Sequence, residues 1–244
     1  MVEHDPAAYG DRAAAVYDEL FGSLEDTEDA VSFLAEIAGP GPVLELGIGT
    51  GRLAIPLAER GIAVQGIDAS RAMVDQLHSK PAGEGIDVTI GDFADVPVDG
   101  RFRLIHVAFN TFFALLTQEE QVRCLDRVRS HLIDDGAFVL EAFVPDMTRW
   151  DAHQATTTQR VEDGRVILET SRHDPVGQRI DSFGIVLTEE GIRMIPIKLR
   201  YAWPAELDLM ARLAGLRLRE RWGGWDRSPF DSGSTKHVSV YEPG

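Results

Sequence analysis

Residues 43–70, VLELGIGTGRLAIPLAERGIAVQGIDAS, decide the fold that we expect for this chain. A short apolar run at 43–46 leads into three closely spaced glycines. A helical pattern follows over 51–60, and a second apolar run over 63–67. Glycines let a chain turn sharply and approach a ligand closely, and the helix that follows offers free N–H groups. The stretch therefore predicts two neighbouring strands with a ligand-binding loop between them.

The alternation of apolar runs and helical stretches continues beyond this unit. Continuous apolar runs are typical of parallel strands covered on both faces, and repeated alternation with helices indicates a doubly wound α/β sheet. Two amphipathic helices are also expected in the acidic N-terminal part, the second with Thr27 as a candidate N-cap and an end at Gly39. Further strands are predicted at 87–90, 104–109 and 137–143, and helices at 8–22, 26–39, 71–79 and 118–132.

Residues 150–203 interrupt this rhythm. Glycine-containing turns separate stretches rich in β-forming residues, which predicts a small antiparallel β insertion. A helix beginning at Pro204 and two strands, at 216–222 and 236–241, are expected to complete the main sheet. The chain is thus divided into N-terminal helices (1–40), a core (41–149), the insertion (150–203) and a closing helix with the last strand pair (204–244).

Composition narrows the possible partners and location. The 244 residues include 24 Lys and Arg against 40 Asp and Glu, giving a formal charge of −16. Such an acidic protein repels phosphate backbones and anionic lipid, so we expect neither nucleic acid nor a membrane as partner. The acidic N-terminus does not resemble a signal peptide. The single cysteine, Cys124, excludes an internal disulfide, which fits a cytoplasmic protein.

The residues around the glycines bear on which cofactor the loop binds. Asp68 follows Gly47 by 21 residues and could accept hydrogen bonds from a ribose diol, as in both nicotinamide and S-adenosylmethionine enzymes. The dinucleotide pattern G-x-G-x-x-G fails, because Arg52 occupies its third glycine position. Glu45 would repel a pyrophosphate but could hold the cationic amino-acid end of S-adenosylmethionine.

With these motifs the sequence resembles the class I S-adenosylmethionine-dependent methyltransferases. The resemblance covers roughly residues 30–145 and the closing strand pair. It implies a Rossmann-like fold, N-terminal lid helices, S-adenosylmethionine as cofactor and a small-molecule acceptor. The antiparallel insertion is similar to that of small bacterial enzymes that methylate amino sugars and glycine. The matching motifs are ELGIGTG at 45–51, GIDAS at 66–70, GDF at 91–93 and VAFNT at 107–111.

The resemblance also implies a set of cofactor-binding residues. In the family the glycine loop contacts the methionine part, the acid at Asp68 binds the ribose, and Asp92 accepts a hydrogen bond from the adenine amino group. Asn110 would face both the methionine part and the acceptor. The full set is Glu45, Gly47, Gly49, Gly51, Asp68, Ala69, Met73, Asp92, Phe93 and Asn110.

Several side chains are candidates for the catalytic step. Tyr17 and Tyr9 lie on the expected lid, and we prefer Tyr17; His106 and Glu141 lie on expected strands, and His173 in the insertion. Each has a structural alternative: an aromatic helix face, a buried core histidine, an ion pair of the sheet, or a solvated hairpin end. A neutral amine acceptor needs little general base, whereas a hydroxyl acceptor needs one.

We therefore expect an enzyme that methylates a nitrogen or oxygen of a small molecule, in natural-product biosynthesis, acting as a monomer or homodimer. No histidine or cysteine spacing indicates a metal site. The alternatives are a catalytically silent S-adenosylmethionine-binding module and a nicotinamide-dependent oxidoreductase.

Overall fold

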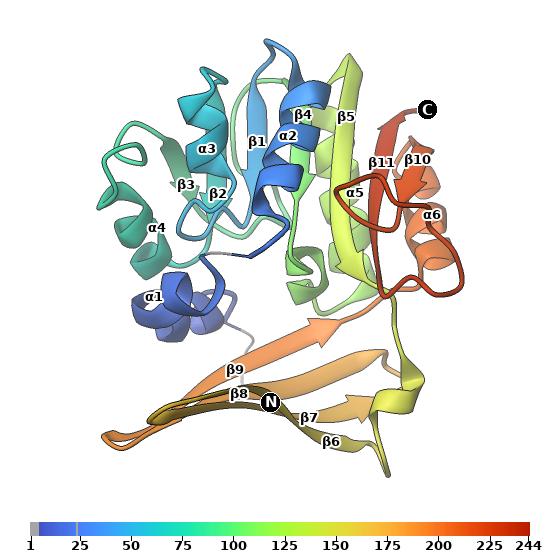
Figure 1. Ribbon diagram of the computed structural model, residues 1–244. Coiled ribbons are helices and arrows are strands. Elements are labelled where there is room, and N and C mark those ends of the chain that lie inside the picture. The colour runs from blue at the N-terminus through green and yellow to red at the C-terminus, as the bar shows by residue number, and fades with distance from the viewer. Residues whose placement is uncertain (1–4, 23) are drawn as a thin grey trace.

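A seven-stranded, mostly parallel sheet forms the core of the protein in the computed structural model, which describes residues 5–22 and 24–244 (Figure 1). From edge to edge its strands are β10 (Leu216–Trp222), β11 (Lys236–Pro243), β5 (Leu132–Phe143), β4 (Phe102–Val107), β1 (Val43–Leu46), β2 (Val64–Asp68) and β3 (Asp87–Ile90). Strand β11 pairs antiparallel with both β10 and β5, and the other neighbouring strands of this sheet pair in parallel. The strand order reverses between β1 and β4, where doubly wound sheets bind their ligands.

Helices cover both faces of this sheet, as the apolar strands require (Figure 1). One buried cluster joins the sheet to two helices near β5 and β10, and a second joins the opposite face to two others. The first pair is α5 (Gln118–His131) and α6 (Pro204–Leu213), and the second is α2 (Thr27–Ala38) and α3 (Ala54–Glu59). Helix α4 (Arg71–His78) follows β2, and short 3-10 turns lie at Thr111–Ala114 and Met147–Arg149. Within the described residues, no helix is both long and apolar enough to cross a membrane.

The predicted α/β alternation is confirmed, but some boundaries were wrong. Helix α3 begins at Ala54 rather than 51, because Gly49 and Gly51 have φ of 57° and 85°, outside the helical range. Strand β4 ends at Val107, and β5 begins at Leu132 instead of 137. The N-cap of α2 is Asp26, not Thr27, whose hydroxyl accepts a hydrogen bond from Arg52 at 3.1 Å.

The predicted β insertion is a second, separate sheet. Its four antiparallel strands follow one another as β6 (Gln154–Glu162), β7 (Arg165–Asp174), β8 (Arg179–Thr188) and β9 (Gly191–Arg200). Figure 1 shows this sheet below the core, with α1 (Ala8–Phe21) between the two. Ala13 and Ala14 of α1 share a buried cluster with Met73 of α4 and Ile195 of β9. Helix α1 is therefore packed against the core on one side and the insertion on the other.

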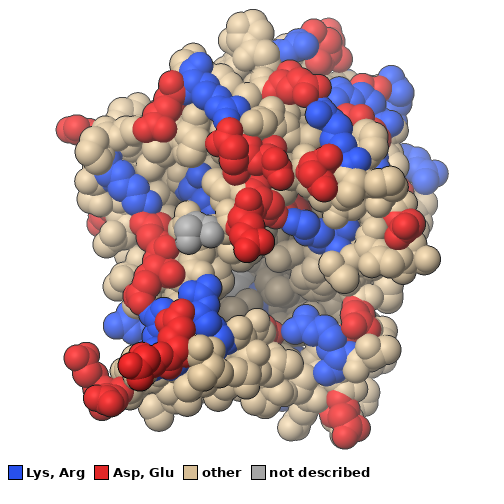
Figure 2. All heavy atoms as spheres, viewed as in Figure 1, with Lys and Arg blue, Asp and Glu red and all other residues tan. Residues whose placement is uncertain are grey.

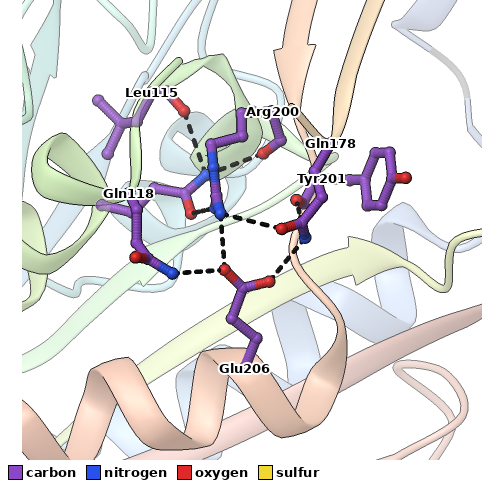
Figure 3. Close-up of polar contacts among 7 residues, drawn as sticks. Leu115, Gln118, Gln178, Arg200, Tyr201 and Glu206 are labelled. Atoms are coloured by element: carbon purple, nitrogen blue, oxygen red, sulfur yellow. Dashed lines mark hydrogen bonds and ion pairs between the residues drawn. The ribbon is translucent and has the colours of Figure 1, made fainter. Parts of the chain in front are cut away.

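A buried polar network joins the insertion to the core (Figure 3). Arg200, at the end of β9, is 7% exposed and donates to Gln121 of α5 at 2.7 Å and to Glu206 of α6 at 2.6 Å. It also donates to Gln178 at 3.2 Å, while the Gln121 amide returns a bond to the Arg200 carbonyl at 2.8 Å. Because the buried guanidinium is paired and hydrogen-bonded, its desolvation is compensated. The orientation of the insertion is thus defined by specific partners.

Candidate active site

The glycine loop after β1 is open on one side. Gly47, Gly49 and Gly51 have φ of 71°, 57° and 85°, which residues with a side chain rarely adopt. The amide of Gly47 donates to the Ile67 carbonyl at 2.8 Å, so the loop folds across the end of β2. A Cβ at Gly47 would lie 2.5 Å from the Thr111 side chain, whereas one at Gly49 would meet nothing within 4 Å. The open space beside Gly49 leaves room for a ligand against the backbone.

Asp68, at the end of β2, holds this loop in place. Its Oδ2 accepts the Gly49 N–H at 2.8 Å and its Oδ1 accepts the Ser70 N–H at 2.8 Å. Burial raises the pKa of Asp68, and the two backbone hydrogen bonds oppose that rise. Each carboxylate oxygen keeps a second lone pair that can accept from a hydroxyl. The arrangement fits the ribose contact that we expect.

Glu45 and His106 form a buried pair on neighbouring strands. They are register partners on β1 and β4, and Glu45 Oε2 lies 3.9 Å from His106 Nε2. Burial raises the pKa of Glu45 to about 8, although the Arg52 charge lowers it, and burial together with Arg52 lowers the pKa of His106 to about 3. Within the described part of the chain, Glu45 Oε2 and both ring nitrogens of His106 have no hydrogen-bond partner.

An unpartnered buried carboxylate oxygen beside the glycine loop fits a cationic group of a ligand. Burial of a charge is costly unless it is paired, so a ligand ammonium at Glu45 would remove part of this cost. The residues present therefore fit S-adenosylmethionine, whose amino-acid end carries an ammonium. They fit a pyrophosphate less well, since the carboxylate would repel it.

The residues expected near adenine lie at the same edge of the sheet. Asp92 follows β3, and its Oδ1 accepts the Ala94 N–H at 2.8 Å. Phe93 is buried in the core cluster and Met73 in the cluster beneath α1. The Met73 amide donates to the Ser70 hydroxyl at 3.2 Å, which caps α4, and Ala69 precedes this cap. The fold thus brings these residues close to the ends of β2 and β3, as the motif order implied.

Polar contacts hold helix α1 against the glycine loop and the start of α4, at the ends of β1 and β2. The Ser70 hydroxyl donates to Asp11 at 2.6 Å, and the Thr50 hydroxyl donates to Asp18 at 2.5 Å. Lys80 pairs with the other Asp18 oxygen at 2.6 Å and donates to the Thr50 carbonyl at 2.8 Å. Acidic side chains of α1 thus contact the glycine loop and the cap of α4. A ligand bound beside the loop would be covered by this helix.

Tyr17 of α1 lies among the charges of the candidate cofactor site. Burial raises its pKa to about 12, with Arg52 lowering it and Glu45 and Asp68 raising it. Its ring contacts Tyr9 and Phe21 at centroid distances of 6.4 and 5.2 Å. At neutral pH the hydroxyl is protonated, so it is suited to donate a hydrogen bond rather than to remove a proton.

A cavity of about 520 Å³ opens at the carboxyl ends of β4 and β5. Figure 2 shows the surface hollowed between the core and the four-stranded sheet, with acidic side chains gathered on the core above the hollow. The ring of Phe109, which lines this cavity, contacts the Phe21 ring at a centroid distance of 5.4 Å, and the Arg52 guanidinium lies over it at 5.5 Å. The lining residues are Leu24, Glu25, Asp26, Phe109, Asn110, Glu141, Phe143 and Lys236.

Four polar side chains of this cavity, those of Asp26, Asn110, Glu141 and Lys236, already have partners. Glu141 Oε2 accepts the Phe109 N–H at 2.8 Å, and its Oε1 lies 3.3 Å from Lys236 Nζ. Lys236 also pairs with Asp26, in the connection between α1 and α2. Asn110 Oδ1 accepts the Phe143 N–H at 2.7 Å. Phe109 and Asn110 have φ of 55° and 65°, and these bonds stabilise that uncommon backbone conformation.

The other sequence candidates lie elsewhere. His106 is fully buried behind the glycine loop and is not among the residues lining the cavity. His173 stacks on Trp150 at 4.2 Å and is hydrogen-bonded to the Tyr201 hydroxyl at 2.9 Å, and burial lowers its pKa. No sequence pattern marked Lys236 and Asp26, because they are far apart in the chain and only the fold brings them together.

Comparison with known proteins identifies similar chains. Residues 43–136 match the family model of a methyltransferase domain. The cypemycin N-terminal methyltransferase of a Streptomyces species is 30% identical over 242 residues, covering 98% of both chains. The CcbJ methyltransferase of Streptomyces caelestis is 42% identical, with a TM-score of 0.93 over 99% of this chain and 100% of that one. CalS10 of Micromonospora echinaspora, an amino pentose methyltransferase solved with bound S-adenosylmethionine, shares the fold at 22% identity, with a TM-score of 0.67 over 93% and 94% of the chains.

Proposed function

Because the chain belongs to the class I S-adenosylmethionine-dependent methyltransferases, we propose that it methylates an amine nitrogen of a small molecule. The cofactor supplies a methyl group that is already activated on a sulfonium. The protein's own tasks are then to bind the cofactor, orient the acceptor and exclude water. For binding we propose Glu45 at the ammonium, the glycine loop at the methionine part and Asp68 at the ribose. Ala69, Met73, Asp92 and Phe93 would surround the adenine, and Asn110 would lie between cofactor and acceptor.

Nitrogen is preferred as the acceptor atom because none of the three catalytic candidates is suited to act as a general base at the cavity. Glu141 is bonded to Phe109 N–H and Lys236, and Tyr17 is protonated at neutral pH. His106 is buried away from the cavity. A hydroxyl acceptor would need a base to take its proton, whereas an amine can attack with its own lone pair. The three catalytic candidates are thus better suited to positioning than to proton removal.

Charge around the cavity supports the same acceptor class. Glu25 and Asp26 line it together with Glu141, against the single positive charge of Lys236. This excess of carboxylates attracts an acceptor that circulates as an ammonium and repels a polyanion. One relative that matches 98% of this chain is named for methylation of an N-terminus, which is also an amine. We extend to this chain the amine chemistry and a role in natural-product biosynthesis.

The domain division follows from this proposal. Residues 1–40 would form the lid, 41–149 and 204–244 the cofactor-binding core, and 150–203 the opposite wall of the acceptor pocket. Tyr17 would hold the cofactor or the acceptor by a donated hydrogen bond once the lid is closed. Effective molarities for such positioning reach about 10⁵–10⁸ M in favourable cases, so alignment alone can supply much of the acceleration.

The test is acceptor screening with purified protein and methyl-labelled S-adenosylmethionine. The panel would contain amino sugars, cyclic secondary amines and short peptides with free N-termini, each matched by an N-acetylated or hydroxyl analogue. We expect S-adenosylhomocysteine to form with an amine and the label to reside on nitrogen, and Asp68→Ala to reduce turnover. Exclusive methylation of a hydroxyl would contradict the proposal. Cofactor binding without turnover on any acceptor would favour the silent binding module.

A further inference from the structure

The insertion sheet has an outer face that points away from the core. Successive residues of a strand point to opposite faces of a sheet. On β8 and β9, Ile180, Ser182 and Ile195 are buried, and Ile195 packs against α1. The residues that alternate with them along each strand, such as Phe183 on β8 and Met194 on β9, therefore point outward. In Figure 1 this outer face is the lower surface of the insertion, opposite α1.

The outer face carries a block of apolar side chains in register on three strands. Residues that pair across an antiparallel sheet lie on the same face, so the block follows directly from the strand pairing. Ile192, Met194 and Phe183 are 71%, 45% and 40% exposed. The three rows of the block are Val166, Leu187 and Ile192; Leu168, Ile185 and Met194; and Thr170, Phe183 and Pro196.

A contiguous apolar patch of this kind marks an interaction surface. Isolated exposed apolar residues are ordinary, but eight of nine positions in one block are not. Each strand of the block alternates these residues with others that face α1 and the core. The pattern is that of a sheet covered on both faces, although within the described residues only one face is covered.

Charged residues at the two ends of the block indicate what covers it. At one end, on the same face, Lys198 pairs in register with Asp181, which also forms an ion pair with Arg172 at 2.8 Å. This row carries one net positive charge. At the other end, the exposed β8–β9 turn contains Glu189 and Glu190. The face is thus basic at one end, apolar in the centre and acidic at the other end.

We propose that this face binds a second copy of the chain, with the two insertion sheets stacked against each other. A two-fold axis between the sheets, at right angles to the strands, reverses the strand direction of the second copy. The Lys198 end of one copy then lies over the Glu189 and Glu190 turn of the other, twice in the dimer. A two-fold axis along the strands would instead place like charges together, so the charge pattern selects the first arrangement.

The area is sufficient for a stable dimer. Four strands about 4.8 Å apart and ten residues rising about 3.3 Å each give a face of roughly 600 Å² per copy, or about 1,200 Å² in total. This reaches the lower bound of specific, stable protein interfaces. Since the opposite face of the same sheet packs on α1, association would also stabilise the wall of the cleft. The inference does not depend on which acceptor the enzyme uses.

The experiment is sedimentation velocity on the full-length protein from 1 to 50 µM. We expect an assembly of two copies, or an even multiple, of the 26.9 kDa chain. Met194→Glu and Ile192→Glu place charge in the block at exposed positions and should weaken association at least tenfold. Leu213→Glu is the matched control, because Leu213 is 79% exposed on α6, outside the block. It should leave the assembly unchanged.

A charge exchange tests the orientation. Lys198→Glu alone and Glu189→Lys with Glu190→Lys should each weaken the dimer, and the triple variant should recover it at least in part. Circular dichroism and S-adenosylhomocysteine binding check that each variant is folded. A variant that binds S-adenosylhomocysteine normally but does not associate concerns the dimer alone and leaves the proposed function untouched. A monomeric wild-type protein at 50 µM, or a dimer that survives both Met194→Glu and Ile192→Glu, would overturn it. Failure of the triple variant to recover association would reject the stacked arrangement.

Discussion

Raising the pH from 6.5 to 8.5 should tighten the binding of S-adenosylhomocysteine roughly 25-fold, because Glu45 must lose a proton to pair with the ligand ammonium. Burial beside the glycine loop raises the pKa of this carboxyl to about 8 in the free protein. A bound cation at the unpartnered Oε2 would favour the charged form and lower that pKa. Binding below pH 8 is then linked to the release of a proton, so affinity rises with pH.

The magnitude follows from the fraction of Glu45 that is already charged. With a pKa of about 8, this fraction is about 0.03 at pH 6.5 and about 0.76 at pH 8.5. The ratio corresponds to about 1.9 kcal/mol of binding free energy. The other ionisable groups that act on Glu45 are Arg52 and Asp68, with His106 as its strand partner. His106 has a pKa of about 3 and stays neutral over this range.

The assay is calorimetric titration with S-adenosylhomocysteine at both pH values, in two buffers of different ionisation enthalpy. We expect about one proton released per ligand at pH 6.5 and about a quarter of one at pH 8.5. The matched variant is Glu45→Gln, which has nearly the same shape but no charge. It should bind more weakly at pH 8.5 and release no proton. Any pH dependence that it retains belongs to other groups, Asp68 first among them.

Two results would refute this reasoning. An affinity that is the same at both pH values in the wild-type protein would show that the charge of Glu45 is not needed for binding. Equal proton release by the wild type and Glu45→Gln would assign the linkage to another group. Either result would leave the assignment of the chain to the methyltransferase family unchanged, because the experiment concerns only how one carboxyl contacts the ligand.

Three substitutions test other parts of the structure. Asp68→Ala removes the acceptor of two backbone N–H groups, so it should cost about 1–3 kcal/mol in unfolding free energy, measured by chemical denaturation. It should also lower the affinity for S-adenosylhomocysteine at least tenfold in calorimetry, and an unchanged affinity would contradict the proposed ribose contact. Lys80→Met removes a partly exposed ion pair with Asp18, so the free energy of unfolding should change by less than about 1 kcal/mol. Limited proteolysis of the N-terminal helix should become severalfold faster, and an unchanged cleavage rate would show that other contacts keep this helix on the core. Arg200→Met removes a buried guanidinium that pairs with the partly buried Glu206 and with two glutamines, and it should cost about 3 kcal/mol in urea unfolding, with Arg200→Lys losing less. Equal losses in the two variants would argue that the several hydrogen bonds of the guanidinium do not matter.

The order of elements along the chain was predictable from local patterns. Apolar runs indicated the positions of β1 and β4, because a strand buried on both faces needs continuous apolar residues. The glycine-containing turns of the insertion predicted its meander for a similarly local reason. The errors lie at strand and helix ends, where a positive φ at Gly51 or Phe109 interrupts a regular pattern that the residue types alone would continue.

The roles of the polar residues were harder to predict from the sequence. Glu141 interrupts an apolar strand, which marked it as a candidate, but its partners Phe109 and Lys236 lie 32 and 95 residues away. His106 looked equally suited to catalysis or to the core, and its complete burial beside Glu45 depends on strand pairing. Such contacts join distant parts of the chain, so no sequence spacing reveals them.

The sequence by itself determined the doubly wound α/β core, the glycine loop with its acids, and the antiparallel insertion, because each follows from periodicity and from backbone conformations that few residues adopt. The tertiary structure alone decided that α1 packs over the loop and that Lys236 links Asp26 to Glu141. It also decided that, among the residues the structure describes, Oε2 of Glu45 has no hydrogen-bond partner beside the loop, and which face of the insertion sheet remains exposed. These properties depend on burial and on distances between remote residues, and both are fixed only when the elements pack together.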